Sequence, residues 1–145
     1  MPTLWTIGYQ QLWPDALIAE LESAGIQRVL DVRLRPQSRR PGMSKTKLAL
    51  ALAEHGIAYE HRRELGTPLE IRGLFRAGHL ETAAAAYRVH AAAHAAGELD
   101  ALAAELDGGP PTALLCLEAS PAGCHRRVVA ELLGERVAGL VVVDL

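Results

Sequence analysis

The sequence predicts an α/β protein, a three-layer α/β/α sandwich on a mainly parallel five-stranded sheet. Short apolar runs typical of buried strands alternate along the chain with segments whose apolar residues recur at helical spacing. Glycine and proline stand between these segments as turn signals. The chain has 145 residues, half of them hydrophobic, which suits one domain over residues 1–145 with its own core.

The predicted elements follow from apolar runs and their flanking residues. Strands are expected over residues 4–8, 28–32, 57–60, 112–117 and 136–145, the last of them buried. Helices are expected over residues 14–24, 45–55, 81–106 and 124–133, with Gly97 dividing the third. Pro14 and Ser44 are typical of helix starts, and Gly25 and Gly56 of helix ends. Residues 62–80 are expected to form a long irregular connection.

Charge and cysteine content limit the classes of function. The net charge of -2 argues against a protein that coats nucleic acid nonspecifically, but seven of the fifteen basic residues fall within residues 28–47, which permits a local basic site. No secretory leader and no uncharged run long enough to span a membrane is visible, so we expect a cytoplasmic protein with no membrane partner. The two cysteines are expected to be thiols. Nothing in the sequence indicates a cofactor or predicts an oligomeric state.

Residues 111–133 contain the most distinctive segment. A buried strand, a loop with Ser, Pro and Gly, and a helix follow one another, so Cys124, His125 and Arg126 are expected on the first helical turn. A helix start carries partial positive charge, which attracts anions and favours a thiolate over a thiol. Alternatively, Cys124 is a buried cap residue with a structural role only, and His125 and Arg126 are a solvated basic pair.

The polar residues that follow the strands predict an anion site. In a parallel sheet these residues meet at the carboxyl edge, where ligands bind. Arginine pairs bidentately with phosphate, so we expect a phosphate-bearing small molecule or a nucleic acid as partner. The alternative is that these basic residues belong to a solvated loop and bind no anion. The candidate anion-binding residues are Tyr9, Arg33, Arg39, Arg40, Lys45, His125 and Arg126.

Catalysis at the same edge would use Cys124 as the nucleophile. His61 or His125 is the candidate base, and Glu118 or Asp31 would orient it. The two carboxylates are equally well interpreted as neutralising the arginines. No metal site is expected: zinc held by Cys116, Cys124, His125 and His61 remains an alternative, but the cysteine spacing is not that of a zinc finger. His90 and His94 have no further donors at ligand spacing.

A set of short motifs is spread over nearly the whole chain. The motifs are Thr6-Ile7-Gly8-Tyr9, Asp31-Val32-Arg33, Pro36, Ser38-Arg39, Pro41-Gly42-Met43-Ser44-Lys45, Gly56-Ile57, Tyr59, His61, Leu65-Gly66, Cys116-Leu117-Glu118, Pro121 and Cys124-His125-Arg126. Together they resemble the domain of unknown function family 488 (DUF488). Met43, Leu117 and Ser120 depart from the family's usual residues. The resemblance implies a compact α/β domain and supports the choice of site, while it assigns no catalytic residue.

Two classes of function remain open from the sequence. The first is a thiol-dependent enzyme acting on a nucleotide or nucleic-acid substrate. The second is a module that binds a nucleotide or nucleic acid without turnover, and a scaffold with a purely structural site is a third reading. Asp31-Val32-Arg33 followed by a distant helix-start cysteine is also loosely similar to rhodanese-type sulfur carriers, although the active loop that begins with the cysteine is missing.

Overall fold

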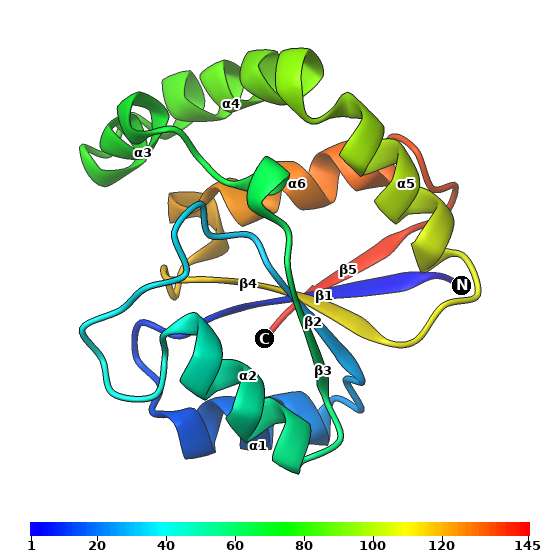
Figure 1. Ribbon diagram of the computed structural model, residues 1–145. Helices are drawn as coiled ribbons and strands as arrows, with labels where there is room; N and C mark the ends of the chain where they lie inside the picture. The colour runs from blue at the N-terminus through cyan, green and yellow to red at the C-terminus, as the bar shows by residue number, and fades with distance from the viewer.

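A five-stranded sheet forms the middle layer of the computed structural model, which describes residues 1–145 (Figure 1). The strand order is β3-β2-β4-β1-β5, and every neighbouring pair is parallel. The α/β fold on a parallel five-stranded sheet is thereby confirmed. The strands are β1 (Thr3–Gly8), β2 (Arg28–Asp31), β3 (Ala58–His61), β4 (Thr112–Cys116) and β5 (Val141–Asp144).

Helices cover both faces of the sheet. Helices α1 (Pro14–Ser23) and α2 (Lys45–Glu54) lie on one face. The opposite face carries the remaining helices (Figure 1). These are α3 (Leu69–Arg76), α4 (Leu80–His94), α5 (Ala96–Leu106) and α6 (His125–Gly134). Two short 3-10 turns, η1 (Arg63–Leu65) and η2 (Pro121–Gly123), stand before α3 and α6.

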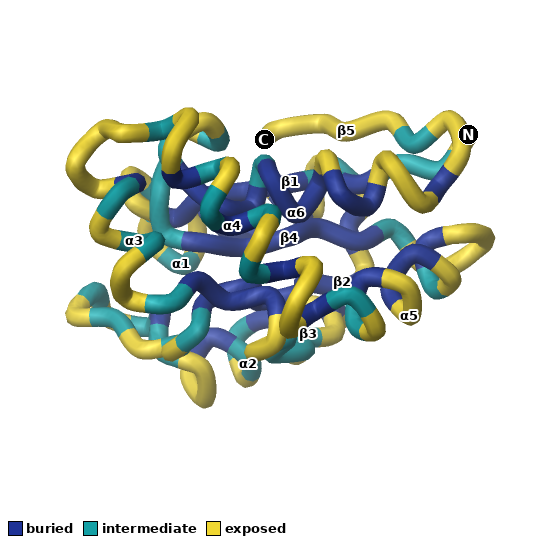
Figure 2. Tube along the Cα trace, turned by 90° about the horizontal axis from the view of Figure 1, so that it is seen from above, coloured by how far each residue is buried: buried dark blue, intermediate teal, exposed yellow.

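The hydrophobic core is divided between the two faces of the sheet. Successive strand side chains point to opposite faces, so β4 contributes Ala113 and Leu115 to the cluster beneath α1 and α2. Leu114 and Cys116 belong to the cluster beneath α4, α5 and α6. The alternation therefore places the Cys116 side chain on the same side of the sheet as α6. Figure 2 shows β4 and β2 buried at the centre of the molecule.

The position of β4 creates the crevice where a site can form. Strand β4 pairs with β1 on one side and β2 on the other, although both precede it by many residues. The chain leaves β1 and β2 toward α1 and α2, whereas it leaves β4 toward α6 on the opposite face (Figure 1). In open parallel sheets, ligands bind at the carboxyl edge where successive connections diverge in this way.

Three sequence-based expectations about the elements are wrong. Strand β5 is exposed rather than buried, because it is an edge strand that pairs only with β1; its three valines are 36–41% exposed. Residues 62–80 are not irregular throughout, since α3 packs Phe75 against the core and its flanking Pro68 and Gly78 act as end signals. The break between α4 and α5 falls at Ala95, which is non-helical and buried, rather than at Gly97.

No helix combines the length and the apolar character needed to cross a lipid bilayer.

Candidate functional site

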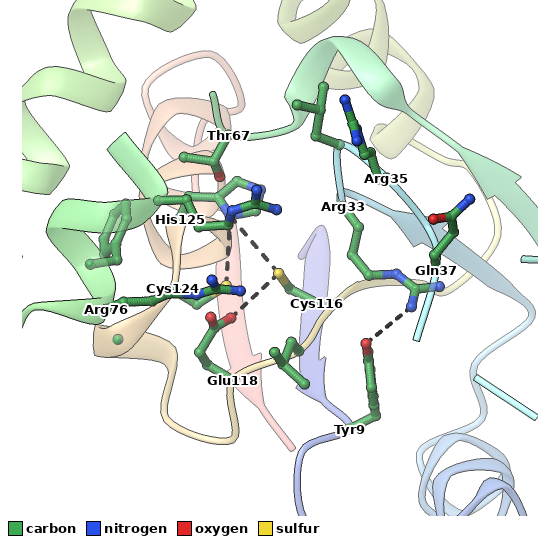
Figure 3. Close-up of a pocket in the computed structure, with 15 residues that line it drawn as sticks. Tyr9, Arg33, Arg35, Gln37, Thr67, Arg76, Cys116, Glu118, Cys124 and His125 are labelled. Atoms are coloured by element: carbon green, nitrogen blue, oxygen red, sulfur yellow. Dashed lines mark hydrogen bonds between the residues drawn. The ribbon is translucent and has the colours of Figure 1, made fainter. Parts of the chain in front are cut away.

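A pocket of about 110 Å³ opens at the carboxyl ends of β1, β2 and β4. Figure 3 shows the side chains that line it, which come from four separate parts of the chain. These parts are the end of β1, the loop after β2, helix α3 with the turn before it, and the loop from β4 into α6. The pocket thus lies in the crevice that the strand order creates.

Two sulfur atoms converge on one imidazole nitrogen in this pocket. His125 Nδ1 lies 3.7 Å from the Sγ of Cys124 and 3.9 Å from the Sγ of Cys116. His125 Nε2 donates to the backbone carbonyl of Val32 at 2.8 Å, which fixes the ring and turns Nδ1 toward both sulfurs. Cys116 Sγ also donates to Glu118 Oε2 at 3.6 Å (Figure 3).

Cys124 is the N-cap of α6. The sequence instead suggested that Cys124 lies in the first turn of the helix. Its backbone is extended, and its Sγ accepts a hydrogen bond from the Arg126 backbone N–H at 3.5 Å. An N-cap side chain normally satisfies one of the free amides at a helix start, and here a sulfur takes that place. The helix dipole therefore favours negative charge on this sulfur.

The electrostatics of the site favour a thiolate at Cys124. Burial alone would raise the pKa of Cys124, but the neighbouring Cys116 side chain and the His125 imidazole outweigh burial and hold the pKa well below its ordinary value. Burial acts to lower the pKa of His125, yet pairing with Cys124 raises it overall. The pKa of Cys116 is raised by the neighbouring Cys124 and by burial. A Cys124 thiolate beside a His125 imidazolium is the favoured state, with Cys116 neutral.

Glu118 is the acidic group of the pocket. Burial raises the pKa of its carboxyl group, and the negative charge on Cys124 raises it further. The neutral acid is therefore easier to form here than at a solvated glutamate. Of the two candidate carboxylates, only Glu118 lines the pocket.

The rim of the pocket carries arginines that have no carboxylate partner. Arg35, Arg72 and Arg76 line the pocket, and none of them forms a salt bridge. The Nε of Arg72 is buried and has no hydrogen-bond partner. A buried donor without a partner costs free energy. Figure 3 shows the Arg76 guanidinium extending into the pocket.

Arg33 also lines the pocket, but its guanidinium is already engaged. Its Nε and Nη2 form a bidentate pair with Asp31, with Nη2 2.7 Å from Oδ2. Its Nη1 donates to the Tyr9 hydroxyl at 3.1 Å and to the Met43 carbonyl at 2.8 Å. Asp31 itself is fully buried and also accepts from the Tyr59 hydroxyl. Arg33 and Tyr9 therefore form one wall of the pocket, and these hydrogen bonds hold their side chains in place.

Asp31 and His61, predicted as catalytic residues, do not line the pocket. Asp31 lies beneath its wall and is occupied by Arg33 and Tyr59. His61 Nε2 bonds to the Arg33 carbonyl at 2.7 Å. The only group of three or more candidate metal ligands consists of Cys116, Cys124 and His125, so His61 does not complete the alternative zinc site.

Arg126 lies outside the pocket because its side chain supports the loop beneath it. It is fully buried, and its guanidinium donates to the carbonyls of Glu118 and Ala119 and to the Thr6 hydroxyl. Gly8 touches the same turn, and a Cβ at this position would collide with the Glu118 carbonyl. The loop that carries Glu118 is therefore held from two sides.

The remaining predicted anion-binding residues line a second, separate concavity. Arg39, Arg40 and Lys45 border a shallow depression over the loop after β2, which no hydrophobic residue lines. The Arg40 guanidinium donates to the Gln10 carbonyl and stacks over the Trp13 ring at 5.3 Å. The basic residues of this loop therefore lie at two sites. Arg33 and Arg35 line the pocket that contains Cys116 and Cys124, whereas Arg39, Arg40 and Lys45 line the second concavity.

Sequence reasoning missed Arg72 and Arg76. Both belong to α3, a helix inside the segment expected to be irregular, and their spacing of four residues places them on one helix face. The apolar residues Ile71, Leu74 and Phe75 were the available signal, since they recur at helical spacing and pack against the core. Thr67 and Gln37 also line the pocket without having been predicted.

The fold and the site define a class: parallel α/β/α sandwiches with a buried thiol–imidazole group at the carboxyl edge of the sheet. The sequence profile of the family described as "Domain of unknown function DUF488" matches residues 14–133, and the chain belongs to this family. The resemblance indicated by the motifs is confirmed. No curated protein and no solved structure shows significant similarity to the chain.

Proposed function

We propose that this protein is a thiol-dependent enzyme acting on a phosphate-bearing substrate of the nucleotide or nucleic-acid type, with Cys124 as its nucleophile. The observation that supports it best is the pairing of Cys124 Sγ with His125 Nδ1 at 3.7 Å inside a pocket bordered by unpaired arginines. A nucleophile next to an imidazole whose other nitrogen is held in place is the arrangement that covalent catalysis uses.

The chemistry follows from the favoured protonation states. The Cys124 thiolate forms a bond to the electrophilic atom of the substrate, and the bond to the leaving group breaks. The leaving group takes the Nδ1 proton of His125. Water then attacks the covalent intermediate, giving its proton to the neutral His125, and the thiolate is released. Glu118 accepts the Cys116 S–H bond and thereby holds Cys116 beside the nucleophile.

Phosphate recognition is assigned to Arg72 and Arg76, with Arg35 contributing from the facing loop. Guanidinium groups without carboxylate partners are the donors that remain free for a ligand. The cavity volume of about 110 Å³ has room for several water molecules and hence for one phosphate-sized group. The rest of a nucleotide would extend over the rim toward solvent.

Alkylation with iodoacetamide tests this proposal. We expect Cys124 to be labelled faster than Cys116 at neutral pH, and inorganic phosphate or a mononucleotide to slow the labelling. Arg72→Ala/Arg76→Ala should lose the protection while Cys124 keeps its reactivity. Arg127→Ala is the matched control, because Arg127 lies on α6 outside the pocket. Equal and slow labelling of both cysteines, without protection by phosphate, would contradict the proposal.

A non-catalytic nucleotide or nucleic-acid binding module is the second candidate, and the concavity over the loop after β2 favours it. Arg39, Lys45 and Lys47 are exposed there, and the exposed Trp13 ring lies under Arg40. Cations beside an aromatic ring suit a single-stranded nucleic acid. Salt-dependent oligonucleotide binding that is lost in Arg39→Ala/Arg40→Ala but kept in Cys124→Ser would support this candidate over the enzyme.

A further inference from the structure

The second cysteine of the pocket has no part in the proposed catalytic steps. Cys116 ends β4, and Cys124 caps α6 eight residues later. Both side chains are buried, and both line the same pocket. A buried thiol beside an activated thiolate can form a disulfide with it, a reaction that needs both groups.

The geometry brings the two sulfurs close enough to react with each other. Both contact His125 Nδ1, and all three ligand atoms lie within 4.8 Å of one another. A disulfide needs the sulfurs at about 2 Å, so a side-chain rotation together with a small shift of the intervening loop closes the gap. Cys124 is suited to this movement because it lies outside the helical hydrogen-bond ladder of α6.

We propose that Cys116 and Cys124 form a reversible dithiol–disulfide couple that reduces small hydroperoxides in the pocket. Cys124 is the group that attacks the peroxide, and Cys116 is the group that resolves the product. The inference rests on the proposed function only in sharing Cys124 as the reactive thiolate. A cavity of about 110 Å³ admits a small peroxide as readily as a phosphate group.

Both steps balance in atoms and electrons. The Cys124 thiolate attacks the terminal peroxide oxygen, so that an S–O bond forms and the O–O bond breaks. The departing alkoxide or hydroxide takes a proton from His125. Cys116, having passed its proton to Glu118, attacks the sulfur of the sulfenic acid; an S–S bond forms, and hydroxide leaves as water after taking that proton. Two thiols lose two electrons, the peroxide gains them, and an external dithiol regenerates the reduced site.

Hydrogen peroxide, added in stoichiometric amount to the full chain, tests the couple. Peptide mapping of the wild type should show a Cys116–Cys124 disulfide, no adduct with the sulfenic-acid reagent dimedone, and complete reversal by dithiothreitol. Cys116→Ser should stop at the first step and give a dimedone adduct on Cys124. Cys124→Ser should leave Cys116 unoxidised, because no thiolate begins the reaction.

The wild-type map decides the outcome even if a variant does not fold. A dimedone adduct or a higher oxide on Cys124, with Cys116 still free, would overturn the inference. The proposed function is judged separately, by phosphate protection of Cys124 in reduced protein. If phosphate protects Cys124 but no disulfide forms, the enzyme proposal stands and the dithiol–disulfide couple is refuted. If the disulfide forms but phosphate gives no protection, the couple stands and the enzyme proposal is refuted.

Discussion

His125 Nε2 donates to the Val32 carbonyl across 2.8 Å, and this hydrogen bond joins the start of α6 to the residue that follows β2. Val32 and His125 lie more than ninety residues apart in the sequence. Because the carbonyl can only accept, Nε2 carries the hydrogen and Nδ1 faces the two sulfurs. The chemistry of the pocket therefore depends on a contact between the first residue of α6 and the loop after β2, at the carboxyl edge of the sheet.

His125→Gln should weaken the nucleophile. The amide can still reach the Val32 carbonyl, but it carries no titratable nitrogen to pair with Cys124. We expect the rate of Cys124 alkylation at pH 7 to fall about tenfold, since an ordinary thiol is only a few per cent ionised there. The pH profile of alkylation should move toward higher pH. His90→Gln, on α4 outside the thiol pocket, is the control and should leave the profile unchanged.

Arg126→Ala should destabilise the fold. The substitution empties a fully buried site and leaves the Glu118 and Ala119 carbonyls without their donor. We expect the free energy of unfolding to fall by about 3 kcal/mol. Arg127→Ala removes an exposed i,i+4 pair with Glu131 and should cost about 0.5 kcal/mol or less. Urea denaturation measures both, and equal losses would contradict the buried role of Arg126.

Gly8→Ala should disturb the loop that carries Glu118. The new Cβ would overlap the Glu118 carbonyl, a backbone atom that cannot rotate away. We expect a loss of about 2 kcal/mol or more in the free energy of unfolding, together with slower Cys124 alkylation. Gly97→Ala, in α5 with no neighbouring atom in reach, should instead stabilise the protein by about 0.5 kcal/mol. A Gly8→Ala variant as stable as the wild type would contradict this prediction, because the turn would then have shifted to make room for the Cβ.

Glu118→Gln should change how stability depends on pH. Burial raises the pKa of Glu118 in the folded protein, so folding favours the protonated carboxyl group. That stabilisation is complete below the ordinary pKa of about 4.3 and is lost as the pH rises through the raised folded value. Glutamine stays neutral throughout. The variant should therefore gain stability relative to the wild type as the pH rises above about 4.3 in urea denaturation, and a pH-independent difference would refute this.

The sequence predicts the sheet well because its inner strands are short apolar runs between glycine and proline signals. Strand β4 is buried along its whole length, as its composition indicates. Strand β5 has the same apolar character, yet it lies exposed at the edge, since strand order decides how many neighbours a strand has. Helix α3 escaped prediction because Pro68 and Gly78, which delimit it, look the same in a loop and at helix ends.

The candidate site was predicted in part. Cys124, His125 and Glu118 belong to one segment, so their proximity follows from a strand, a loop and a helix start. Arg33 reaches the same pocket from the loop after β2, whereas Arg39 and Lys45 of that loop line the other concavity. Composition identifies a basic loop, but the path of its backbone decides which side chains face the thiols.

The sequence by itself determined the parallel α/β architecture, the family and the segment that bears Cys124 and His125, because apolar periodicity and turn residues act over short distances. Only the tertiary structure decided that Arg126 is a buried support and that Arg72 and Arg76 complete the rim. Each of these depends on strand order and on side chains that meet across the sheet edge. Such long-range contacts are set by packing of the whole chain, which no local pattern records.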